Sequence, residues 1–317
     1  MNPSVFFVGC ARSGTTLLYR LADAHPLMAI TPELHWITDY FREGRWLGPR
    51  GVVTPDQVAS MLENNKRFRQ FKFTHREFEG LLVDGEPVPY VIFLNRLFGL
   101  YGRKRRKSLV GNKTPAFVRR IPVLHSLWPS AKFVHLIRDG RDVCLSVLDW
   151  NHADRAAGRY STWANDPVMT TALWWKRKVR LGRQGGQPLA AGLYCEMRYE
   201  DLVNCPATQC ARMCAFLDVR YDAAMLRFHE GRMRTKPGLD AKRAWLPVTP
   251  GLRDWRAQMA PADVERFEAA AGDLLEELGY PRACARPSPR VLEQAHQVQD
   301  AFTADLRARE DMVPELW

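Results

Sequence analysis

The sequence contains no long apolar run: none of its 317 residues belongs to a stretch of 18 consecutive apolar residues. A transmembrane helix is therefore not expected. The first apolar segment, residues 5–8, has no basic residues before it and is too short for the core of a signal peptide, so we interpret it as a strand of the folded protein. A cytoplasmic location is the expectation that follows.

Cysteine shows no pairing pattern. The chain has 7 cysteines, an odd number, and no C-x-x-C unit or matching histidine pair accompanies the cluster of Cys205, Cys210 and Cys214. The sequence is therefore not that of a disulfide scaffold, and it carries no zinc-site signature. A reducing cytoplasm fits this pattern, and the Ala- and Arg-rich composition is compatible with a bacterial enzyme.

Positive charge is in excess. Lysine and arginine number 46 against 35 acidic residues, which gives a formal net charge of +11. A surplus of this size indicates an anionic partner such as phosphate or sulfate. No nucleic-acid-binding motif accompanies the charge, so nucleic acid is not the expected partner.

Short apolar segments alternate with segments of helical periodicity, which is typical of a parallel sheet with helices on its faces. We expect strands at 4–9, 132–137 and 191–199, and helices at 13–24, 140–150, 208–217, 262–278 and 290–309. These elements predict one α/β domain over residues 1–317, with a P-loop-like central parallel sheet flanked by helices. Helical insertions, mainly at 34–110, and a helical C-terminal tail at 285–317 complete the expected fold.

Glycine and hydroxyl residues gather in the turn after the first strand, Gly9-Cys10-Ala11-Arg12-Ser13-Gly14-Thr15-Thr16. In this context the backbone N–H groups at a helix start bind phosphate. Gly9 and Gly14 have the spacing of the nucleoside-triphosphate loop G-x-x-x-x-G-K-[ST], with Thr16 at the hydroxyl position. Thr15, however, replaces the lysine, and the positive charge moves to Arg12. The turn is therefore suited to an anion rather than to a magnesium triphosphate.

A second charged segment follows the next expected strand. Arg138 stands at the edge where open α/β sheets bind ligands, and Ser146, on the following helix, is placed to face back toward it. A guanidinium with a hydroxyl makes a suitable clamp for a second phosphate. Asp139 and Asp142 are expected to cap the helix or to pair with Arg141. The alternative is an Arg–Asp network that only supports the helix start.

Together the two motifs resemble the sulfotransferase family, whose donor is 3′-phosphoadenosine 5′-phosphosulfate and whose product is adenosine 3′,5′-bisphosphate. The Arg-Ser-Gly-Thr-Thr form is similar to the protein-tyrosine and bacterial branches. Residues 111–115, 198–202 and 255–280 resemble further family segments. The resemblance implies that Arg12, Ser13, Gly14, Thr15, Thr16, Arg138 and Ser146 hold the donor, that Tyr199 lies beside adenine, and that no metal is required. It also places residues 34–110 on the acceptor side.

The resemblance also suggests a catalytic base. Glu33 resembles the catalytic glutamate of the tyrosyl-protein branch, and the heparan-modifying branch carries a similar glutamate–x–histidine–aromatic stretch. A partly apolar cleft beside Trp36 is expected to raise the pKa of Glu33 toward the working range. His35 is the rival base, and on an extended segment the two side chains point the same way. Arg12 and Lys113 are the candidates to stabilise the leaving group. The late basic residues Lys236, Lys242 and Arg243 are left open as further contacts to the donor.

The expected reaction is in-line transfer of a sulfuryl group to a hydroxyl or amine. The acceptor remains open among small molecules, glycans, lipids and peptides, and nothing indicates the oligomeric state. The alternative function is a P-loop kinase or nucleotidase with magnesium-dependent nucleotide binding. A further alternative concerns Trp163, Trp174 and Trp175, which either pack in the core or line an acceptor pocket.

Overall fold

The computed structural model describes residues 3–38, 51–64, 68–82, 86–230 and 246–312. Lys236, Lys242 and Arg243 lie outside the described residues, so their contact with a donor stays a prediction.

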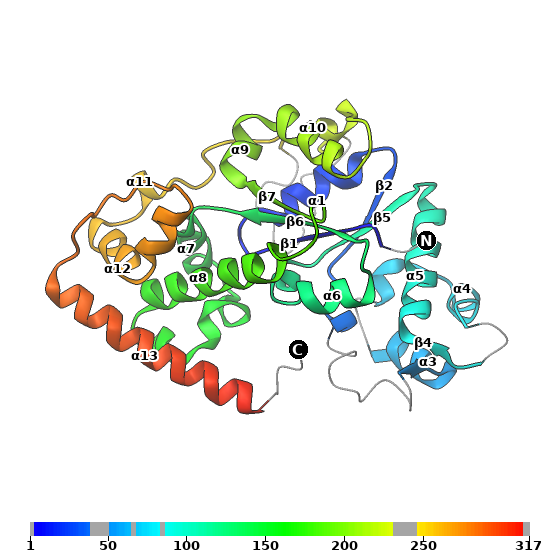
Figure 1. The fold of residues 1–317 in the computed structure, drawn as a ribbon, viewed down its shortest axis with the longest axis horizontal. Helices are drawn as coiled ribbons and strands as arrows, with labels where there is room; N and C mark the ends of the chain where they lie inside the picture. Colours follow the sequence, from blue (N-terminus) through cyan, green and yellow to red (C-terminus); the bar gives the residue numbers. More distant parts are fainter. Residues whose placement is uncertain (1–2, 39–50, 65–67, 83–85, 231–245, 313–317) are drawn as a thin grey trace.

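A five-stranded parallel sheet forms the centre of the protein (Figure 1). Its order is β2 (Met28–Thr31), β5 (Leu109–Lys113), β1 (Val5–Gly9), β6 (Lys132–Ile137) and β7 (Tyr194–Arg198). The central strand β1 pairs in parallel with both β5 and β6, and all of its residues are buried. Burial on both faces explains why this strand is an unbroken apolar run in the sequence.

Helices cover both faces of the sheet. Figure 1 shows α1 (Thr15–Ala24), α9 (Tyr199–Asn204) and α10 (Pro206–Phe216) on one face, and α6 (Ile121–Leu127) and α8 (Pro167–Gly186) on the other. Apolar residues of α1 and α10 share one buried cluster with β2, whereas α8 shares another with α7 (Gly140–Leu148) and α12 (Pro261–Glu277). The predicted α/β fold, with a parallel sheet flanked by helices, is confirmed.

Two groups of helices extend the sheet at opposite ends (Figure 1). At one end lie α3 (Pro55–Asn64), α4 (His75–Glu79), α5 (Tyr90–Arg105) and the short strands β3 (Val52–Val53) and β4 (Val88–Pro89). Phe68, stacked on Phe78 at 4.8 Å, helps to form an aromatic core there. At the other end, α11 (Trp255–Gln258) and α12 lead to the long helix α13 (Pro289–Met312). The proposed domain boundaries themselves stay a prediction.

Most predicted elements lie within a few residues of the observed ones, but the strands β2 and β5 and the helices α6, α8 and α9 were not predicted. β2 has four residues and follows the helix-ending His25-Pro26 pair, so its apolar signal is short. The end of α8 carries glycines, which weaken a helical pattern. Gly182 is required by packing, because a Cβ there would lie 2.5 Å from Cε1 of His135.

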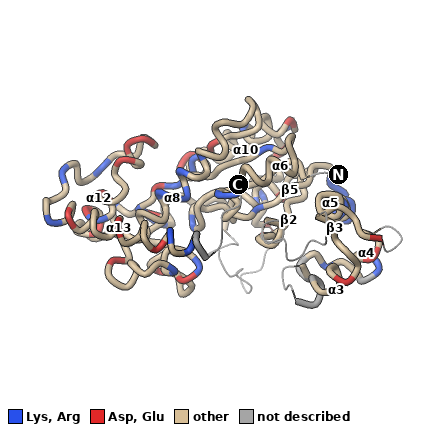
Figure 2. Tube along the Cα trace, turned by 60° about the horizontal axis from the view of Figure 1, so that its bottom comes forward, with Lys and Arg blue, Asp and Glu red and all other residues tan. Residues whose placement is uncertain are grey.

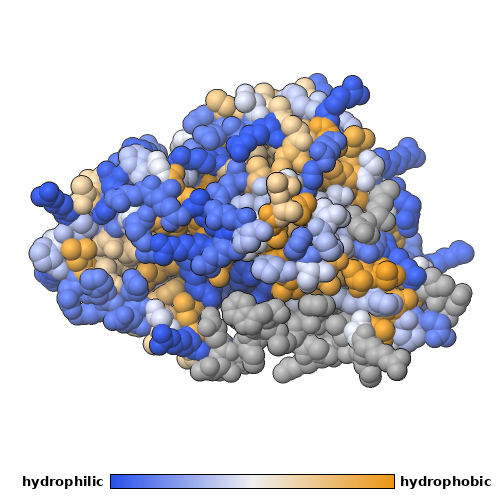
Figure 3. All heavy atoms as spheres, viewed as in Figure 1, coloured by the Kyte–Doolittle hydropathy of each residue, from blue (hydrophilic) through white to orange (hydrophobic). Residues whose placement is uncertain are grey.

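No helix in the described part of the chain has both the length and the apolar character needed to cross a bilayer. Charged positions of both signs are spread over the chain, and Lys and Arg positions are frequent along α8 and at the end of α5 (Figure 2). On the face drawn in Figure 3, hydrophilic residues predominate and apolar side chains show between them in separate patches.

Candidate active site

The carboxyl ends of all five parallel strands bring the predicted site residues to one edge of the sheet. Glu33 follows β2, Lys113 ends β5, the turn Cys10–Gly14 follows β1, Arg138 follows β6 and Tyr199 follows β7. This edge is where open α/β sheets bind ligands. Residues spread over most of the sequence therefore meet because the sheet is parallel.

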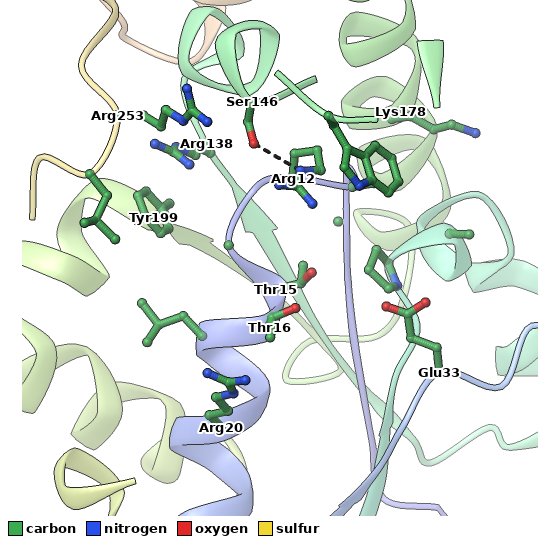
Figure 4. Close-up of a pocket in the computed structure, with 18 of the residues that line it drawn as sticks. Arg12, Thr15, Thr16, Arg20, Glu33, Arg138, Ser146, Lys178, Tyr199 and Arg253 are labelled. Atoms are coloured by element: carbon green, nitrogen blue, oxygen red, sulfur yellow. Dashed lines mark hydrogen bonds between the residues drawn. The ribbon is translucent and has the colours of Figure 1, made fainter. Parts of the chain in front are cut away.

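A cavity of about 850 Å³ opens at this edge (Figure 4). Nine of the predicted residues line it: Arg12, Gly14, Thr15, Thr16, Glu33, His35, Arg138, Ser146 and Tyr199. Arginine and lysine side chains surround it on several sides. Among the described lining residues, Glu33 is the one carboxylate. The cavity is thus suited to a ligand with several negative charges.

The turn after β1 is held in a conformation that favours anion binding. Arg12 and Gly14 both have positive φ, 71° and 91°, and α1 begins directly after Gly14. A Cβ on Gly14 would lie 2.4 Å from Cδ2 of Tyr199, so glycine is needed there for space as well as for backbone conformation. Ser13 is buried, and its Oγ has no hydrogen-bond partner in the described part of the chain. The Ser13 hydroxyl and the N-terminus of α1 can therefore both donate hydrogen bonds to an anion.

Arg12 joins the two motifs. Its Nε donates to Oγ of Ser146 over 3.0 Å, and its guanidinium lies 4.9 Å from the ring centre of Trp150. Ser146 therefore contacts Arg12, whereas the sequence placed it opposite Arg138. In Figure 4 this hydrogen bond lies in the middle of the cavity, between Tyr199 and Glu33.

Arg138 lies on the Tyr199 side of the cavity. Its guanidinium stacks on the Tyr199 ring at 4.2 Å and pairs with Asp142 over 3.2 Å. Burial raises the pKa of Asp142, although Arg138 acts in the opposite direction. The Nε of Arg138 has no hydrogen-bond partner among the described residues, while Trp175 holds its carbonyl through a 3.1 Å hydrogen bond. The backbone of Arg138 is therefore held in place, and its guanidinium keeps an N–H group that can donate a hydrogen bond to a ligand.

Glu33 lies on the other side of Arg12, between two nitrogen groups. Its Oε1 accepts a 2.8 Å hydrogen bond from Nζ of Lys113, and its Oε2 lies 3.1 Å from Nε2 of His35. The expected alignment of Glu33 and His35 is therefore present. Lys113 is 6% exposed, so it is not a solvated loop lysine.

The expected rise in the pKa of Glu33 is wrong. Burial alone raises it, but the hydrogen bond from His35 and the ammonium of Lys113 outweigh burial and hold the pKa well below its ordinary value. Trp36, on which the expectation rested, is buried in the aromatic core at 5.2 Å from Phe68. The deciding cation comes from a different strand, which the local sequence does not reveal.

Six cationic lining residues were not among the predicted site residues: Arg20, Arg119, Arg155, Arg159, Lys178 and Arg253. Arg253 lies beside Arg138 in Figure 4 and pairs with Asp149 over 2.7 Å. Its position two residues before Trp255, where the family resemblance resumes, is the signal that could have found it. Trp174 and Trp175 both pack in the core and Trp163 packs against it, and Trp174 also lines the cavity, so its part in an acceptor pocket stays a prediction.

A buried ionic network connects the C-terminal helices to the residues that follow Arg138. Arg141 donates to Asp139 and, over 2.6 Å, to Glu268 of α12, and its guanidinium stacks on Trp255 at 3.6 Å. The backbone N–H of Trp255 donates to Asp142 over 2.9 Å. Asp139 also caps α7, so both predicted roles of this acidic pair occur.

No three His, Cys, Asp or Glu side chains lie close enough to bind a metal ion in the described ranges. The absence of a metal requirement stays a prediction.

Comparison with known proteins identifies the family of this chain. Residues 3–223 match the model of the sulfotransferase family. The chain belongs to the sulfotransferase family. The prediction of a sulfotransferase is thereby confirmed, and a kinase is not supported.

Relatives of this sulfotransferase are distant. It is 26% identical to protein-tyrosine sulfotransferase 1 of Danio rerio over 94% of this chain and 79% of the relative. It is 32% identical to the omega-hydroxy-beta-dihydromenaquinone-9 sulfotransferase of Mycobacterium bovis, over 67% of this chain and 62% of the relative. The sulfotransferase domain of the Synechococcus PCC 7002 olefin synthase superposes with a TM-score of 0.57 at 23% identity, over 88% of this chain and 95% of that domain. This last likeness supports the fold.

Proposed function

We propose that this sulfotransferase takes 3′-phosphoadenosine 5′-phosphosulfate as donor and transfers the sulfuryl group to an acceptor hydroxyl, with Glu33 as the base. The observation that carries the proposal is the presence of two anion-binding groups in one cavity. The turn with Arg12 lies in its middle, and Arg138 lies beside Tyr199. A donor with charge at both its 5′ and 3′ positions needs two such groups.

The residues fit this donor. Oγ of Ser13 and Nε of Arg138 are buried donors without described partners, and Gly14 leaves space where a side chain would meet Tyr199. We infer that the turn and Arg12 hold the 5′-phosphosulfate, that Arg138 holds the 3′-phosphate and that Tyr199 lies against the adenine. Thr15 and Thr16, which line the same cavity, would add hydroxyl contacts to the 5′ end.

The donor supplies an electrophilic sulfur and a phosphate leaving group. Lys113 and Arg12 are placed to hold the negative charge that develops on the leaving oxygen. Glu33 is placed to accept the proton of the acceptor hydroxyl. Its low pKa in this structure makes it a weak base, so we infer that Lys113 exchanges Glu33 for the phosphosulfate oxygens. This exchange moves the ammonium group of Lys113 away from Glu33. The pKa of Glu33 then rises when the donor binds.

A hydroxyl is the acceptor group that the relatives support. One relative is named for protein tyrosine and another for an omega-hydroxy quinol. The cavity lining also includes Trp150, Trp174 and Pro115, which suit an acceptor with an apolar part.

Calorimetric titration tests the donor assignment. Adenosine 3′,5′-bisphosphate, AMP and ATP are titrated separately without magnesium, and ATP again with magnesium. We expect the bisphosphate to bind at least about tenfold more tightly than AMP, because one charged contact is worth about 1.5–3 kcal/mol. Equal affinities, or binding of ATP with magnesium alone, would refute the donor assignment.

A further inference from the structure

Lys178 of α8 is a buried lysine that the proposed reaction does not use. It is 6% exposed and lines the cavity. No carboxylate or hydrogen-bond acceptor among the described residues contacts its ammonium group. A lysine in such a position is costly to bury, and natural proteins retain it where a ligand compensates the charge.

The surroundings of Lys178 are also cationic. The charged side chains that act on it most strongly are Arg119, Arg177 and Arg159, and together with burial they hold its pKa well below the ordinary value. Arg119 and Arg159 line the same cavity, as does Arg155. Like charges gathered in this way favour an anion that is shared among them.

The position of Lys178 separates it from the proposed 3′-phosphate site. In the view of Figure 4, Arg138, Tyr199 and Arg253 lie on one side of Arg12, and Lys178 lies with Glu33 on the other. Trp174, one helical turn before Lys178 on α8, lines the cavity as well, and its indole N–H is buried without a described partner. The acceptor side therefore offers hydrogen-bond donors.

We propose that Lys178, with Arg119 and Arg159, forms a subsite for a negatively charged group of the acceptor, a carboxylate or a phosphate ester. The inference rests on the proposed function, because it assumes that the hydroxyl of the same acceptor reaches Glu33. It selects acceptors that carry both a hydroxyl and an anionic group. The donor's own sulfonate is the other source of negative charge on this side of Arg12, and the experiment separates the two.

The test uses the full chain saturated with adenosine 3′,5′-bisphosphate and two matched pairs of probes. These are 4-hydroxyphenylacetate with its carboxamide, and 6-hydroxyhexanoate with its carboxamide. Binding is followed by calorimetry. We expect at least one carboxylate to bind about tenfold or more tightly than its amide, because the charge-assisted contact is lost in the amide. Equal affinity within both pairs, including no detectable binding of any probe, overturns the proposal.

Substitutions assign the preference to the subsite. Lys178→Met should remove the preference for the carboxylate and leave the affinity for the bisphosphate unchanged. Lys176→Met is the matched control on the same helix, because Lys176 pairs with Asp273 over 2.7 Å, and it should retain the preference. Arg159→Met, at an exposed position, gives a second variant that should weaken the preference about threefold.

Three further results separate the possible failures. If Lys178→Met weakens binding of 3′-phosphoadenosine 5′-phosphosulfate but not of the bisphosphate, Lys178 holds the donor's sulfonate and the proposal is overturned. If the wild-type protein binds the bisphosphate but does not distinguish carboxylate from amide, the subsite fails and the proposed function stands. If the bisphosphate does not bind at all, the proposed function itself fails.

Discussion

Lys113 donates a 2.8 Å hydrogen bond to Glu33, although the two residues are 80 positions apart in the sequence. The parallel pairing of β2 with β5 brings them together, because Glu33 follows one strand and Lys113 ends the other. The proposed base and the proposed stabiliser of the leaving group therefore neutralise each other in this structure. A ligand that draws Lys113 away from Glu33 therefore changes the electrostatic surroundings of both residues at once.

Substitution of Lys113 tests this coupling. Lys113→Met should lower kcat by about 10²–10³-fold, the usual effect of losing one group that stabilises developing charge. It should also raise the pKa of Glu33, because burial is then opposed by His35 without the help of the Lys113 ammonium. Since the base must be deprotonated, the acid limb of kcat/KM should move to higher pH. A pH profile of the two enzymes measures this, and an unmoved acid limb would contradict the coupling.

Glu33 itself is tested by Glu33→Gln, which keeps the size of the side chain. Turnover should fall about 10²–10⁴-fold, because general base catalysis is lost. The affinity for adenosine 3′,5′-bisphosphate, measured by calorimetry, should stay within about twofold. His35→Gln is the comparison: if it abolishes turnover while Glu33→Gln retains it, the role of base passes to His35.

The sequence predicted which residues lie at the ligand-binding edge of the sheet, but it predicted the pKa of Glu33 in the wrong direction. Gly14, Arg12 and Arg138 were found because a phosphate-binding turn and a strand-end arginine are local patterns. The pKa of Glu33 is lowered by the hydrogen bond from His35 and by Lys113, which comes from another strand, so the predicted direction of the shift was wrong. Lys178 was not among the predicted site residues, because a lysine at the end of the basic run 176–178 gives no sign of burial.

Arg138 should discriminate between nucleotides. Arg138→Ala is expected to weaken adenosine 3′,5′-bisphosphate about 10–100-fold, since a charged hydrogen bond contributes about 1.5–3 kcal/mol. Adenosine 5′-phosphosulfate, which has no 3′-phosphate, should be little affected. Competition binding with both ligands measures this, and equal weakening would place Arg138 elsewhere.

Gly14 is expected to tolerate no side chain. Gly14→Ala should reduce the affinity for the bisphosphate more than tenfold, because the new Cβ meets the Tyr199 ring and φ is positive. Gly192→Ala is the control: its φ is +84° and nothing lies within 4 Å of the added atom, so it carries the backbone cost alone. Similar binding by the two variants would contradict the steric account.

The buried network of Arg141 predicts a stability effect. Glu268→Gln should lower the free energy of unfolding by about 3 kcal/mol, the usual result of removing one partner of a buried ion pair. Chemical denaturation measures it. Glu276→Gln is a matched control on α12, because the Glu276 side chain is 61% exposed and its pairing with Arg282 is worth little. Equal small losses in both variants would show that the network contributes no stability.

The ties between α7 and the C-terminal helices have a consequence for local opening. Glu268 accepts hydrogen bonds from the amides of Ala283 and Cys284, and the same carboxylate pairs with Arg141, three residues after Arg138. These two amides are therefore expected to report on the proposed donor site from a distant part of the sequence. A ligand bound at Arg138 should slow their hydrogen exchange, because the tail and the donor site open together as one cooperative unit.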